Sequence, residues 1–578
     1  MCGIIGLISK KTFSIKNDLL GSLKRLEYRG YDSVGYATNT GKIEKDVGQI
    51  SKFIKHIKGK TNIAIAHTRW ATHGKVIKKN THPHSSEHFM IVHNGIIENF
   101  EKIKQDLIKK GYKFKSETDS EVVAYYFEDK CIKNKKTIDS TIRQFFKDIK
   151  GTFAILLMEK GDNKIYAFKR ESPLVLGIDK NILYLASDIY AFSNKTNKAI
   201  FFEDDEYATV CLDRYQIFNK IGKKLKKKII TFKWSQKESE KKKYPHYMIK
   251  EIKEEPIVAE QLIHSLETDQ KKQLRELKKA VDKAKRVYFI AAGTSFHAAM
   301  VGNHFLNQYG IKSSCWIASE FNVPQLVGKN SLMIVISQSG ETMDLVEAIK
   351  HAKKKGAKVA SIVNVPFSTV QRMSDISINS MAGQEICVAA TKTYVNQVII
   401  LLALAKLYGY DLHLHNIPKN IEKSFRQNER KIKKIAKKIH KKEQMYILGR
   451  GLCYAGALEI ALKIKEISYI HAEGMRGGEL KHGTIALIEK GTPVISLIPK
   501  GNLEMLGNTK EVEARGAFSI RITDKPEGKY HFLMPVTKLG KFVLYSVIIG
   551  QLLAYYVAKE KKLPIDKPRN LAKSVTVK

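Results

Sequence analysis

The last two thirds of the sequence carry the same strand, glycine turn and helix twice, and this duplication restricts the fold more than any other feature. The strand RVYFIAAGTS leads through Gly293 into a helix from Phe296, and EQMYILGRGLCYAG does the same through Gly451, an offset of 451 − 293 = 158 residues. Strands that alternate with helices predict α/β domains with parallel sheets. A second pair, Ser337 and Pro499, has the similar offset 499 − 337 = 162 and predicts two copies of one such domain.

The two copies differ in chemistry where their strands end. SQSGET in the first copy offers hydroxyls, an amide and backbone N–H groups at a helix N-terminus, which predicts an anion site. The matching loop of the second copy has Pro499, which lacks an N–H, and none of those hydroxyls, so we expect one phosphate per chain. A serine-rich loop is also compatible with a simple helix cap. Two such loops, GTS at 293–295 and SQSGET at 337–342, follow predicted parallel strands and favour phosphate binding.

A stripe of charges marks the second copy. Glu459, Lys463 and Glu466 are spaced i, i+4, i+7 and fall on one face of a helix expected around 458–469. The rest of that helix is apolar, which predicts burial, and buried charges pair or shift their pKa values as acid–base catalysts do. A structural ion pair is the alternative interpretation.

The N-terminus indicates a nucleophile. Cys2 follows Met1 and becomes the first residue if the methionine is removed. A terminal cysteine then carries its own base, because its thiol has a reference pKa near ~8.5 and the α-amine near ~7.7–8.0. The apolar run IIGLI at 4–8 predicts a buried strand that would hold it rigidly. A cysteine at position two also arises by chance, so this motif needs support from its context.

Three clusters downstream of the cysteine suit a binding site, because polar residues stand beside glycines after apolar strands. They are LEYRGYDSVG at 26–35, AHTRWATHG at 66–74 and VHNGIIEN at 92–99. His82, His84 and His88 could indicate a metal site, but no Cys or Asp completes a recognisable ligand set. We therefore expect no metal.

These N-terminal motifs resemble a known family. MCGIIG, YRGYDS, HTRWATHG, HPH, HNGIIEN and SETDSE are similar to the N-terminal-nucleophile glutamine amidotransferases, and RWATHG is similar to the amidotransferase half of the glucosamine-6-phosphate synthase family. The resemblance implies an α+β sandwich of the αββα type with Cys2 as nucleophile. The implied glutamine site has Arg69 on the α-carboxylate, Asp119 on the α-amine, Asn94 and Gly95 as the oxyanion hole, Thr72 and His73 lining the pocket, and Trp70 as the gate of an ammonia passage.

The chemistry of these side chains agrees with the implied roles. A guanidinium matches a carboxylate, a carboxylate pairs with an ammonium group, and an amide with a backbone N–H can face a developing oxyanion. Outside the family pattern, Arg69 and Asp119 would be interpreted as an ordinary ion pair.

The resemblance extends over nearly the whole chain. GTS, SQSGET, EICVAATKT, LKIKEISYIHAE, GELKHG and DKPRNLAKSVTV are similar to the isomerase half of the same family, which implies two α/β sugar-isomerase domains and a homodimer without cofactor. Two positions depart from the family: Ala390 stands where many relatives have Ser, and MRGG at 475–478 varies a glycine- and alanine-rich turn.

The resemblance also implies a sugar site. Its catalytic groups would be Glu466 as the base between C1 and C2 of fructose 6-phosphate, Lys463 assisting, His482 from the neighbouring subunit opening the ring, and Lys573 forming a Schiff base. Its binding groups would be Ser295, Ser337, Gln338, Ser339 and Thr342 on the phosphate, and Val388 on the sugar.

A chain of 578 residues is too long for one core. We expect an amidotransferase domain at 2–240, a linker at 241–256, a first sugar-isomerase domain at 257–430, a second at 431–562, and a tail at 563–578 that carries Lys573.

Composition limits the other classes of function. The formal charge of +42 raises the alternative of a nucleic-acid binder, but the lysines form short runs along the whole length with few aromatics, which favours a solvated surface. Six scattered cysteines and the lack of a secretory signal predict reduced thiols and a cytoplasmic protein. The apolar run at 542–558 is short for a bilayer and contains polar residues, so a buried helix is the expectation and a membrane span the alternative.

The predicted reaction moves ammonia from glutamine to fructose 6-phosphate and isomerises the product to glucosamine 6-phosphate. Amidotransferases that make asparagine or phosphoribosylamine would need an ATP-type or phosphoribosyl-type loop, and neither is found. A sugar-phosphate sensor without activity would leave Cys2, Lys573 and the Glu459, Lys463, Glu466 stripe without a purpose.

Overall fold

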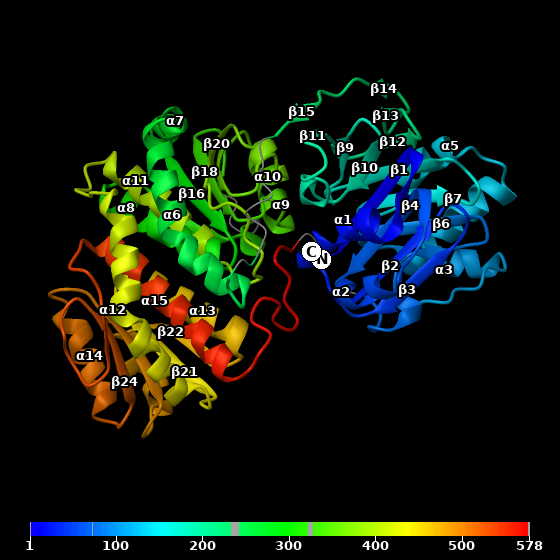
Figure 1. The fold of residues 1–578 in the computed structure, drawn as a ribbon. Coiled ribbons are helices and arrows are strands. Elements are labelled where there is room, and N and C mark those ends of the chain that lie inside the picture. Colours follow the sequence, from blue (N-terminus) through cyan, green and yellow to red (C-terminus); the bar gives the residue numbers. More distant parts are fainter. Residues whose placement is uncertain (1, 72, 233–240, 242, 322–326, 576–578) are drawn as a thin grey trace. The chain divides into compact units, whose positions relative to one another are not determined.

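The structure is a computed structural model that describes residues 2–71, 73–232, 241, 243–321 and 327–575. Contacts within the chain divide it into two compact units after residue 238, and Lys573 belongs to the second (Figure 1).

The first unit is a sandwich of two antiparallel sheets. One sheet has eight strands in the order β15-β11-β9-β10-β1-β4-β2-β3, and the other has seven in the order β14-β13-β12-β8-β7-β6-β5 (Figure 1). Apolar side chains of both sheets form the core between them. Helices α4 and α5 pack their apolar faces on the seven-stranded sheet. The expected αββα sandwich is therefore confirmed.

The bounds in this unit follow chain order. They are β1 (Gly3–Ser14), α1 (Leu20–Lys24), β2 (Ser33–Thr38), β3 (Ile43–Val47), α2 (Ile50–Phe53), β4 (Lys60–Arg69), β5 (His84–Ser85), β6 (Phe89–Ile97), α3 (Phe100–Lys109), α4 (Glu121–Phe127), α5 (Ile138–Asp148), β7 (Gly151–Glu159), β8 (Lys164–Arg170), β9 (Val175–Ile178), β10 (Ile182–Ala186), β11 (Lys198–Phe201), β12 (Glu206–Cys211), β13 (Tyr215–Asn219), β14 (Lys224–Leu225) and β15 (Ile230–Thr231).

The predicted strand after Cys2 is β1, in the middle of the eight-stranded sheet. Its apolar run at 4–8 is fully buried. A Cβ at Gly6 would lie 3.0 Å from Leu156 Cδ1 of the opposite sheet, so the glycine lets the sheets approach closely.

The second unit contains two five-stranded parallel sheets with equivalent strand orders, β17-β16-β18-β19-β20 and β22-β21-β23-β24-β25. Gly293 and Gly451 have φ angles of +55° and +53°, so the two glycine turns share one backbone conformation. The duplication is confirmed. The strand register corrects the alignment of the second pair of strands. Tyr288 pairs with Met333 in the first copy and Tyr446 pairs with Val494 in the second, so β18 and β23 are offset by 494 − 333 = 161 residues. Ser337 therefore corresponds to Ile498, and Pro499 follows one residue later.

The bounds in this unit also follow chain order. They are α6 (Tyr247–Glu267), α7 (Lys271–Lys283), β16 (Arg286–Ala291), α8 (Thr294–Gln308), β17 (Ser313–Ile317), β18 (Ser331–Ser337), α9 (Met343–Lys354), β19 (Lys358–Val363), α10 (Thr369–Arg372), β20 (Ile376–Asn379), α11 (Lys392–Lys406), α12 (Asn416–Ile439), β21 (Gln444–Gly449), α13 (Cys453–Ser468), β22 (His471–Arg476), β23 (Pro493–Ile498), α14 (Leu503–Glu513), β24 (Phe518–Thr523), β25 (His531–Leu533) and α15 (Leu539–Glu560).

Helices α6, α8, α11, α12, α13 and α15 share one apolar core with residues of both sheets. Helix α15 is long and apolar enough for a membrane span, but its apolar window is entirely buried in this core, which confirms the buried helix. Helix α6 begins at Tyr247 and continues through Pro256. Most of the segment 241–256, expected to be a linker, is therefore helix.

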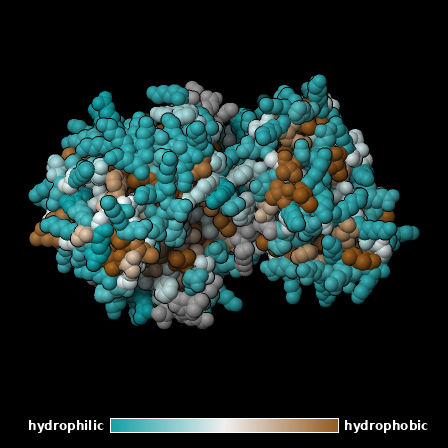
Figure 2. Space-filling view, turned by 90° about the horizontal axis from the view of Figure 1, so that it is seen from below, coloured by the Kyte–Doolittle hydropathy of each residue, from teal (hydrophilic) through white to brown (hydrophobic). Residues whose placement is uncertain are grey.

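The lysine excess lies on the surface. Along α12 the lysines are exposed while the isoleucines on the opposite face are buried. Figure 2 shows one face of the molecule, which is mostly hydrophilic with scattered apolar patches. This arrangement confirms the solvated lysine surface expected from the short, spread-out runs.

Three histidines, called the histidine stack below, are in ring contact inside the first unit, with His67 and His82 stacked and His84 edge-on to His82. The rings of His67 and His82 lie 4.0 Å apart between centroids, and those of His82 and His84 lie 4.4 Å apart. All three are at most 3% exposed, and both ring nitrogens of His82 are buried without a hydrogen-bond partner among the described residues. Burial lowers the pKa of each imidazole well below its usual range, so all three are neutral in the folded protein.

The neutral histidine stack predicts a loss of stability in mild acid. The unfolded chain binds protons near pH 6.5 that the folded unit does not, so stability is complete above about pH 6.5 and falls below it, by about 1.4 kcal/mol per pH unit for each histidine. In His82→Phe we expect this slope to decrease by one histidine's share, because phenylalanine does not bind a proton. The substitution removes no hydrogen bond, since both ring nitrogens of His82 lack a partner among the described residues. The measurement is denaturant unfolding of the full chain from pH 7.5 to 5.5, with hydrogen exchange of β4 as the local readout.

His56→Phe is the matched control, because His56 is exposed in the same unit. It should leave the slope of the parent protein. A slope that is equal in all three proteins would contradict the assignment to the buried stack.

Candidate active sites

The backbone brings Cys2 against Trp70. Strands β1 and β4 pair with Gly3 opposite Thr68, so the residues at the start of β1 and the end of β4 meet. The backbone N–H of Trp70 donates to Cys2 Sγ at 3.4 Å, and Sγ lies 3.5 Å from the carbonyl oxygen of Trp70. Burial raises the pKa of the Cys2 thiol, while the Trp70 backbone and Arg69 act in the opposite direction. The sulfur therefore needs a base to become a nucleophile.

Asn94 and Gly95 lie on β6 beside the cysteine. Asn94 Nδ2 donates to the Cys2 carbonyl oxygen at 2.9 Å, while Asn94 Oδ1 is buried without a partner among the described residues. Gly95 has a φ of +133°, and a Cβ there would lie 2.0 Å from the carbonyl oxygen of Thr152. The path of the chain therefore requires glycine at this position.

The Arg69 side chain is buried and organises the loop after β4. Its guanidinium donates to the backbone carbonyls of His73, Gly74 and Lys75, the last two at 3.1 and 3.3 Å. The ring of His73 packs edge-on against Phe100, with centroids 6.0 Å apart. Thr72, which is in the same loop, lies outside the described residues. Arg69 thus holds the loop that follows β4, next to Trp70 and Cys2.

Asp32 was not singled out in the sequence, although it belongs to the YRGYDS motif. Its Oδ2 accepts a hydrogen bond from the backbone N–H of Ala71 at 2.8 Å, so it supports the same loop. The motif is anchored in turn by Arg29, which pairs with Asp188 at 2.9 Å, and by Tyr28, whose hydroxyl donates to Asp188 at 2.7 Å.

Asp119 is 4% exposed and already holds the end of β6. Its Oδ2 accepts from the backbone N–H of Ile97 at 2.8 Å, and Ser120 Oγ donates to its Oδ1 at 3.3 Å. Both Arg69 and Asp119 contribute to the electrostatic field at the Cys2 thiol. A cation and an anion therefore both act on the pKa of the thiol, Arg69 lowering it and Asp119 raising it.

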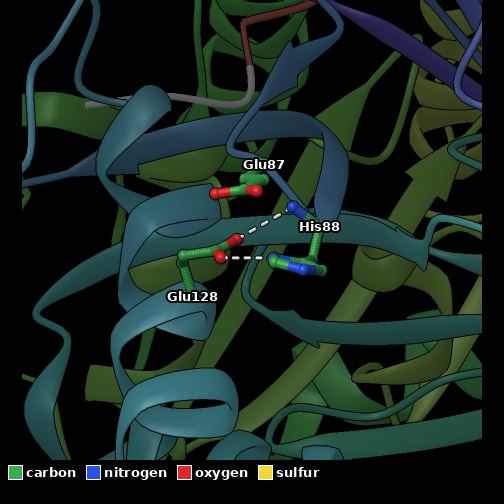
Figure 3. A group of neighbouring side chains, drawn as sticks. All are labelled: Glu87, His88 and Glu128. Carbon is green, nitrogen blue, oxygen red and sulfur yellow. Dashed lines mark hydrogen bonds and ion pairs between the residues drawn. The ribbon is translucent and has the colours of Figure 1, made fainter.

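The three histidines of the metal alternative do not form one site. His82 and His84 belong to the buried stack, whereas His88 lies with Glu87 and Glu128 (Figure 3). His88 Nδ1 is 2.5 Å from Glu128 Oε1, and its backbone N–H donates to Glu128 Oε2 at 3.0 Å. Among the described residues this is the one group of three ligand-type side chains whose ligand atoms lie within 4.8 Å of one another.

The charge stripe on α13 is buried, as its apolar surroundings predict. Lys463 Nζ lies 2.5 Å from Glu466 Oε2 and 3.5 Å from Glu459 Oε1. The side chains of Glu459 and Lys463 are fully buried and that of Glu466 is 19% exposed. Burial acts to lower the pKa of Lys463, but the carboxylates of Glu466 and Glu459 outweigh it, so the pKa of Lys463 lies above its usual value. Burial raises the pKa of Glu466. The stripe supplies a stable ammonium group beside a carboxylate that can act as a base.

Two residues missed in the sequence connect this stripe to the first parallel sheet. Thr294 Oγ1 donates to Glu459 Oε1 at 3.1 Å and accepts from Lys463 Nζ at 2.9 Å. His297 Nδ1 lies 2.7 Å from Glu459 Oε2. Both residues are in the first turn of α8, directly after the Gly293 turn, so the glycine-turn position is the signal that could have indicated them.

The tail brings Lys573 into a buried ion pair with Glu385, at 2.5 Å between Nζ and Oε2. The Lys573 ammonium also contributes to the field at Glu466. Val388, the implied sugar contact, donates its backbone N–H to the carbonyl of Asp566 in the tail at 3.1 Å. His482 is exposed and makes no hydrogen bond or ion pair with these groups within the described chain.

The implied phosphate residues lie at the ends of β16 and β18. Ser337 Oγ accepts from the backbone N–H of Gly340 at 2.9 Å, and Ser295 Oγ accepts from Gln397 Nε2 at 3.1 Å. Ser339 Oγ accepts from the backbone N–H of Glu341 at 3.2 Å. The backbone carbonyl of Gln338 accepts from Val365 at 3.3 Å. These residues therefore shape the loop that leads into α9.

The two copies differ at the helix that follows this loop. Thr342 is the N-cap of α9 and makes no side-chain capping bond. In the second copy, Asn502 caps α14 with its own side chain, which accepts from the backbone N–H of Met505 at 2.9 Å. The equivalent N–H in the first copy, that of Leu345, donates to the backbone carbonyl of Thr342 at 3.1 Å, so the Thr342 side chain is not used as a cap.

Comparisons with known proteins agree with both halves. The glutamine amidotransferase domain family matches residues 67–194, and the SIS domain family matches 281–407 and 438–530. The C-terminal domain of glucosamine-fructose-6-phosphate aminotransferase from Francisella tularensis is 33% identical with a TM-score of 0.53, over 57% of this chain and 100% of that one.

Full-length relatives carry one name. The glutamine--fructose-6-phosphate aminotransferases [isomerizing] of Thermococcus kodakarensis and Pyrococcus horikoshii are 39% and 40% identical to this chain, each over 100% of both proteins. The chain belongs to the glutamine--fructose-6-phosphate aminotransferase (isomerizing) family.

Proposed function

We propose that the chain converts fructose 6-phosphate and glutamine into glucosamine 6-phosphate and glutamate, with the site residues implied by its motifs. The observation that carries the proposal is that one chain combines a partly buried cysteine directly before β1 with a largely buried Glu–Lys–Glu stripe on α13. The first arrangement suits amide hydrolysis and the second suits proton transfer on a sugar.

Glutamine hydrolysis uses the first unit. With Met1 removed, the α-amine of Cys2 accepts the thiol proton as the sulfur attacks the side-chain amide and forms a γ-glutamyl thioester. Asn94 and Gly95 stabilise the oxyanion, and Asp119 binds the α-amine. Arg69, with Thr72 and His73, binds the α-carboxylate. Ammonia leaves past Trp70 through a path that excludes water, because protonated ammonia is not a nucleophile.

Amination and isomerisation use the second unit. Ser295, Ser337, Gln338, Ser339 and Thr342 bind the phosphate, and Val388 contacts the sugar. His482 of a neighbouring subunit opens the ring and Lys573 forms a Schiff base at C2. Glu466, beside the Lys463 ammonium, then moves a proton between C1 and C2.

The remaining expectations belong to the same proposal. They are a homodimer in the cytoplasm that needs no cofactor and binds neither nucleic acid nor membrane. The division into 2–240, 241–256, 257–430, 431–562 and 563–578 is retained, with the N-terminal part of α6 inside the second segment.

Cys2→Ala should abolish glutamine-dependent synthesis and keep sugar-phosphate isomerisation, because only the first unit loses its nucleophile. Glutamate release and isomerisation of fructose 6-phosphate are measured on the same sample, with the intact mass to show the N-terminus. Cys211→Ala, in the same unit, is the control and should keep both activities. Unchanged glutamine use in Cys2→Ala would refute the assignment.

Glu466→Gln should lower proton exchange at C1 of the sugar phosphate by roughly 10²–10⁴-fold, the usual contribution of a general base. Glutamine hydrolysis should be nearly unchanged. In the parent protein, exchange should fall as the pH decreases through the pKa of Glu466, which burial raises above its ordinary value, because the protonated acid is not a base. Solvent isotope exchange at C1, measured by NMR, tests the loss of exchange in the variant and the pH dependence in the parent protein. Glu489→Gln, at an exposed position, is the control. Retained exchange in Glu466→Gln would reject this base.

A further inference from the structure

Glu385 is the buried carboxylate that faces the Lys573 amine. The two side chains are 0% and 2% exposed, and Nζ lies 2.5 Å from Oε2. Glu385 lies between β20 and α11, whereas Lys573 lies in the C-terminal tail, 188 residues later. A lysine buried this deeply cannot exchange its proton freely with water, so its proton needs an internal acceptor.

The other hydrogen bonds of Glu385 fix its position. Oε1 accepts from the backbone N–H groups of Thr391 and Thr393 at 2.9 and 3.1 Å, and Thr393 Oγ1 donates to Oε2 at 2.9 Å. Burial acts to raise the pKa of Glu385, but Lys573 and these backbone donors hold it below its usual range. At rest the pair is therefore a carboxylate and an ammonium group.

Other titratable groups face the pair from the surrounding elements. On α6, burial and Glu385 raise the pKa of Glu251 to about 7 and that of Glu255 well above its usual value. From α13, Lys463 is within the field of Glu385, and Glu466 is within the field of Lys573. Lys392 of α11 is bound by Glu254 at 3.1 Å. Glu251 thus titrates near neutral pH within the field of Lys573, and Lys392 is paired elsewhere. Among the described residues, Glu385 is the side chain that hydrogen-bonds to Lys573 Nζ.

The tail is held where this pairing can form. Met248 of α6 donates its backbone N–H to Asp566 Oδ1 at 3.0 Å, and the backbone N–H of Arg569 donates to the Tyr469 hydroxyl at 2.8 Å. The Arg569 guanidinium lies over the Tyr469 ring, 4.3 Å from its centroid. Tyr469 caps the C-terminus of α13, three residues after Glu466, so the tail and the stripe share an anchor.

We propose that Glu385 is the positioning residue and temporary proton acceptor of Lys573 during Schiff-base formation. The inference rests on the proposed role of Lys573. The ammonium proton moves to Glu385, and the free amine attacks C2, forming the C–N bond as the carbonyl π pair moves to oxygen. Glu385 returns its proton to that oxygen, which gives a carbinolamine with an NH2+ group. Glu385 then carries a second proton from this nitrogen to the hydroxyl group. The hydroxyl leaves as water while the nitrogen lone pair forms the C=N bond of the iminium. The carbonyl compound and the ammonium group thus give an iminium ion and one water, with Glu385 unchanged.

The test follows the iminium by reductive trapping. The full-length protein is incubated with fructose 6-phosphate and cyanoborohydride between about pH 6.5 and 8.5, and the adduct is located by peptide mass. Rates are expressed relative to Glu254→Gln at each pH. That variant removes a carboxylate from the other buried lysines, Lys250 and Lys392, and should trap at the parent rate.

In the parent protein the relative rate should be about 1 at every pH, because the parent and Glu254→Gln both keep Glu385. Glu385→Gln keeps the shape and the hydrogen bonds at Oε1 but cannot take the proton. Its relative rate should be roughly 10²-fold lower at the acidic end and should increase by up to about tenfold per pH unit as solvent base removes the proton. Glutamine hydrolysis should be retained and serves as the folding control.

The outcomes separate the two proposals. No adduct in the parent protein, or an adduct that persists in Lys573→Gln, rejects the Schiff-base role of Lys573 and the inference with it. An adduct on Lys573 together with parent-like trapping in Glu385→Gln, or a decrease that is equal at every pH, rejects only the inference. If Glu385→Gln does not fold, Glu385→Asp decides, because its carboxylate is withdrawn by one methylene. Trapping at the parent rate in that variant would overturn the role of Glu385.

Discussion

Pairing of buried charges is the constraint on which the second unit depends. Lys463 and Lys573 lie almost entirely out of water, as do Glu385 and Glu459. An isolated buried charge is strongly unfavourable, so each of these groups has to meet its partner when the chain folds. The partners come from distant parts of the chain, and the pairs therefore bring the tail, the loop before α11 and helices α8 and α13 together in one arrangement.

The first unit reaches its arrangement by a different route, through the path of the backbone. Cys2 meets Trp70 because β1 and β4 pair in a fixed register, and Gly95 has room only for a hydrogen. The Arg69 guanidinium donates its hydrogen bonds to backbone carbonyls of the loop after β4. Strand pairing and backbone contacts thus place Cys2, Gly95 and Arg69. The first unit also contains a buried ion pair, Arg29–Asp188.

Local patterns in the sequence predicted the strands, turns and helix faces that depend on neighbouring residues. The apolar run after Cys2 predicted β1, the repeated glycine turn predicted the two parallel sheets, and the charge spacing predicted that Glu459 and Lys463 share a buried face. The partners of these charges could not be predicted in the same way. Thr294, His297 and Glu385 have no distinctive spacing from the charged residues they contact, because their proximity arises only when the whole unit folds. The start of α6 within the segment 241–256 was not predicted to the residue, because charged residues and Pro256 interrupt its apolar pattern.

The side-chain cap of Asn502 also bears on how the two copies came to differ. In α14 the Asn502 side chain satisfies a donor that in α9 is bonded to a backbone carbonyl, so the Thr342 side chain is not committed to a cap. The proposed function uses that side chain on the phosphate. If only the first copy binds the phosphate, as in the proposed function, the second copy is not under selection for that role. In that proposal its helix α13 supplies the proton-handling side chains for a sugar phosphate held by the first copy, a division of labour that neither copy could achieve alone.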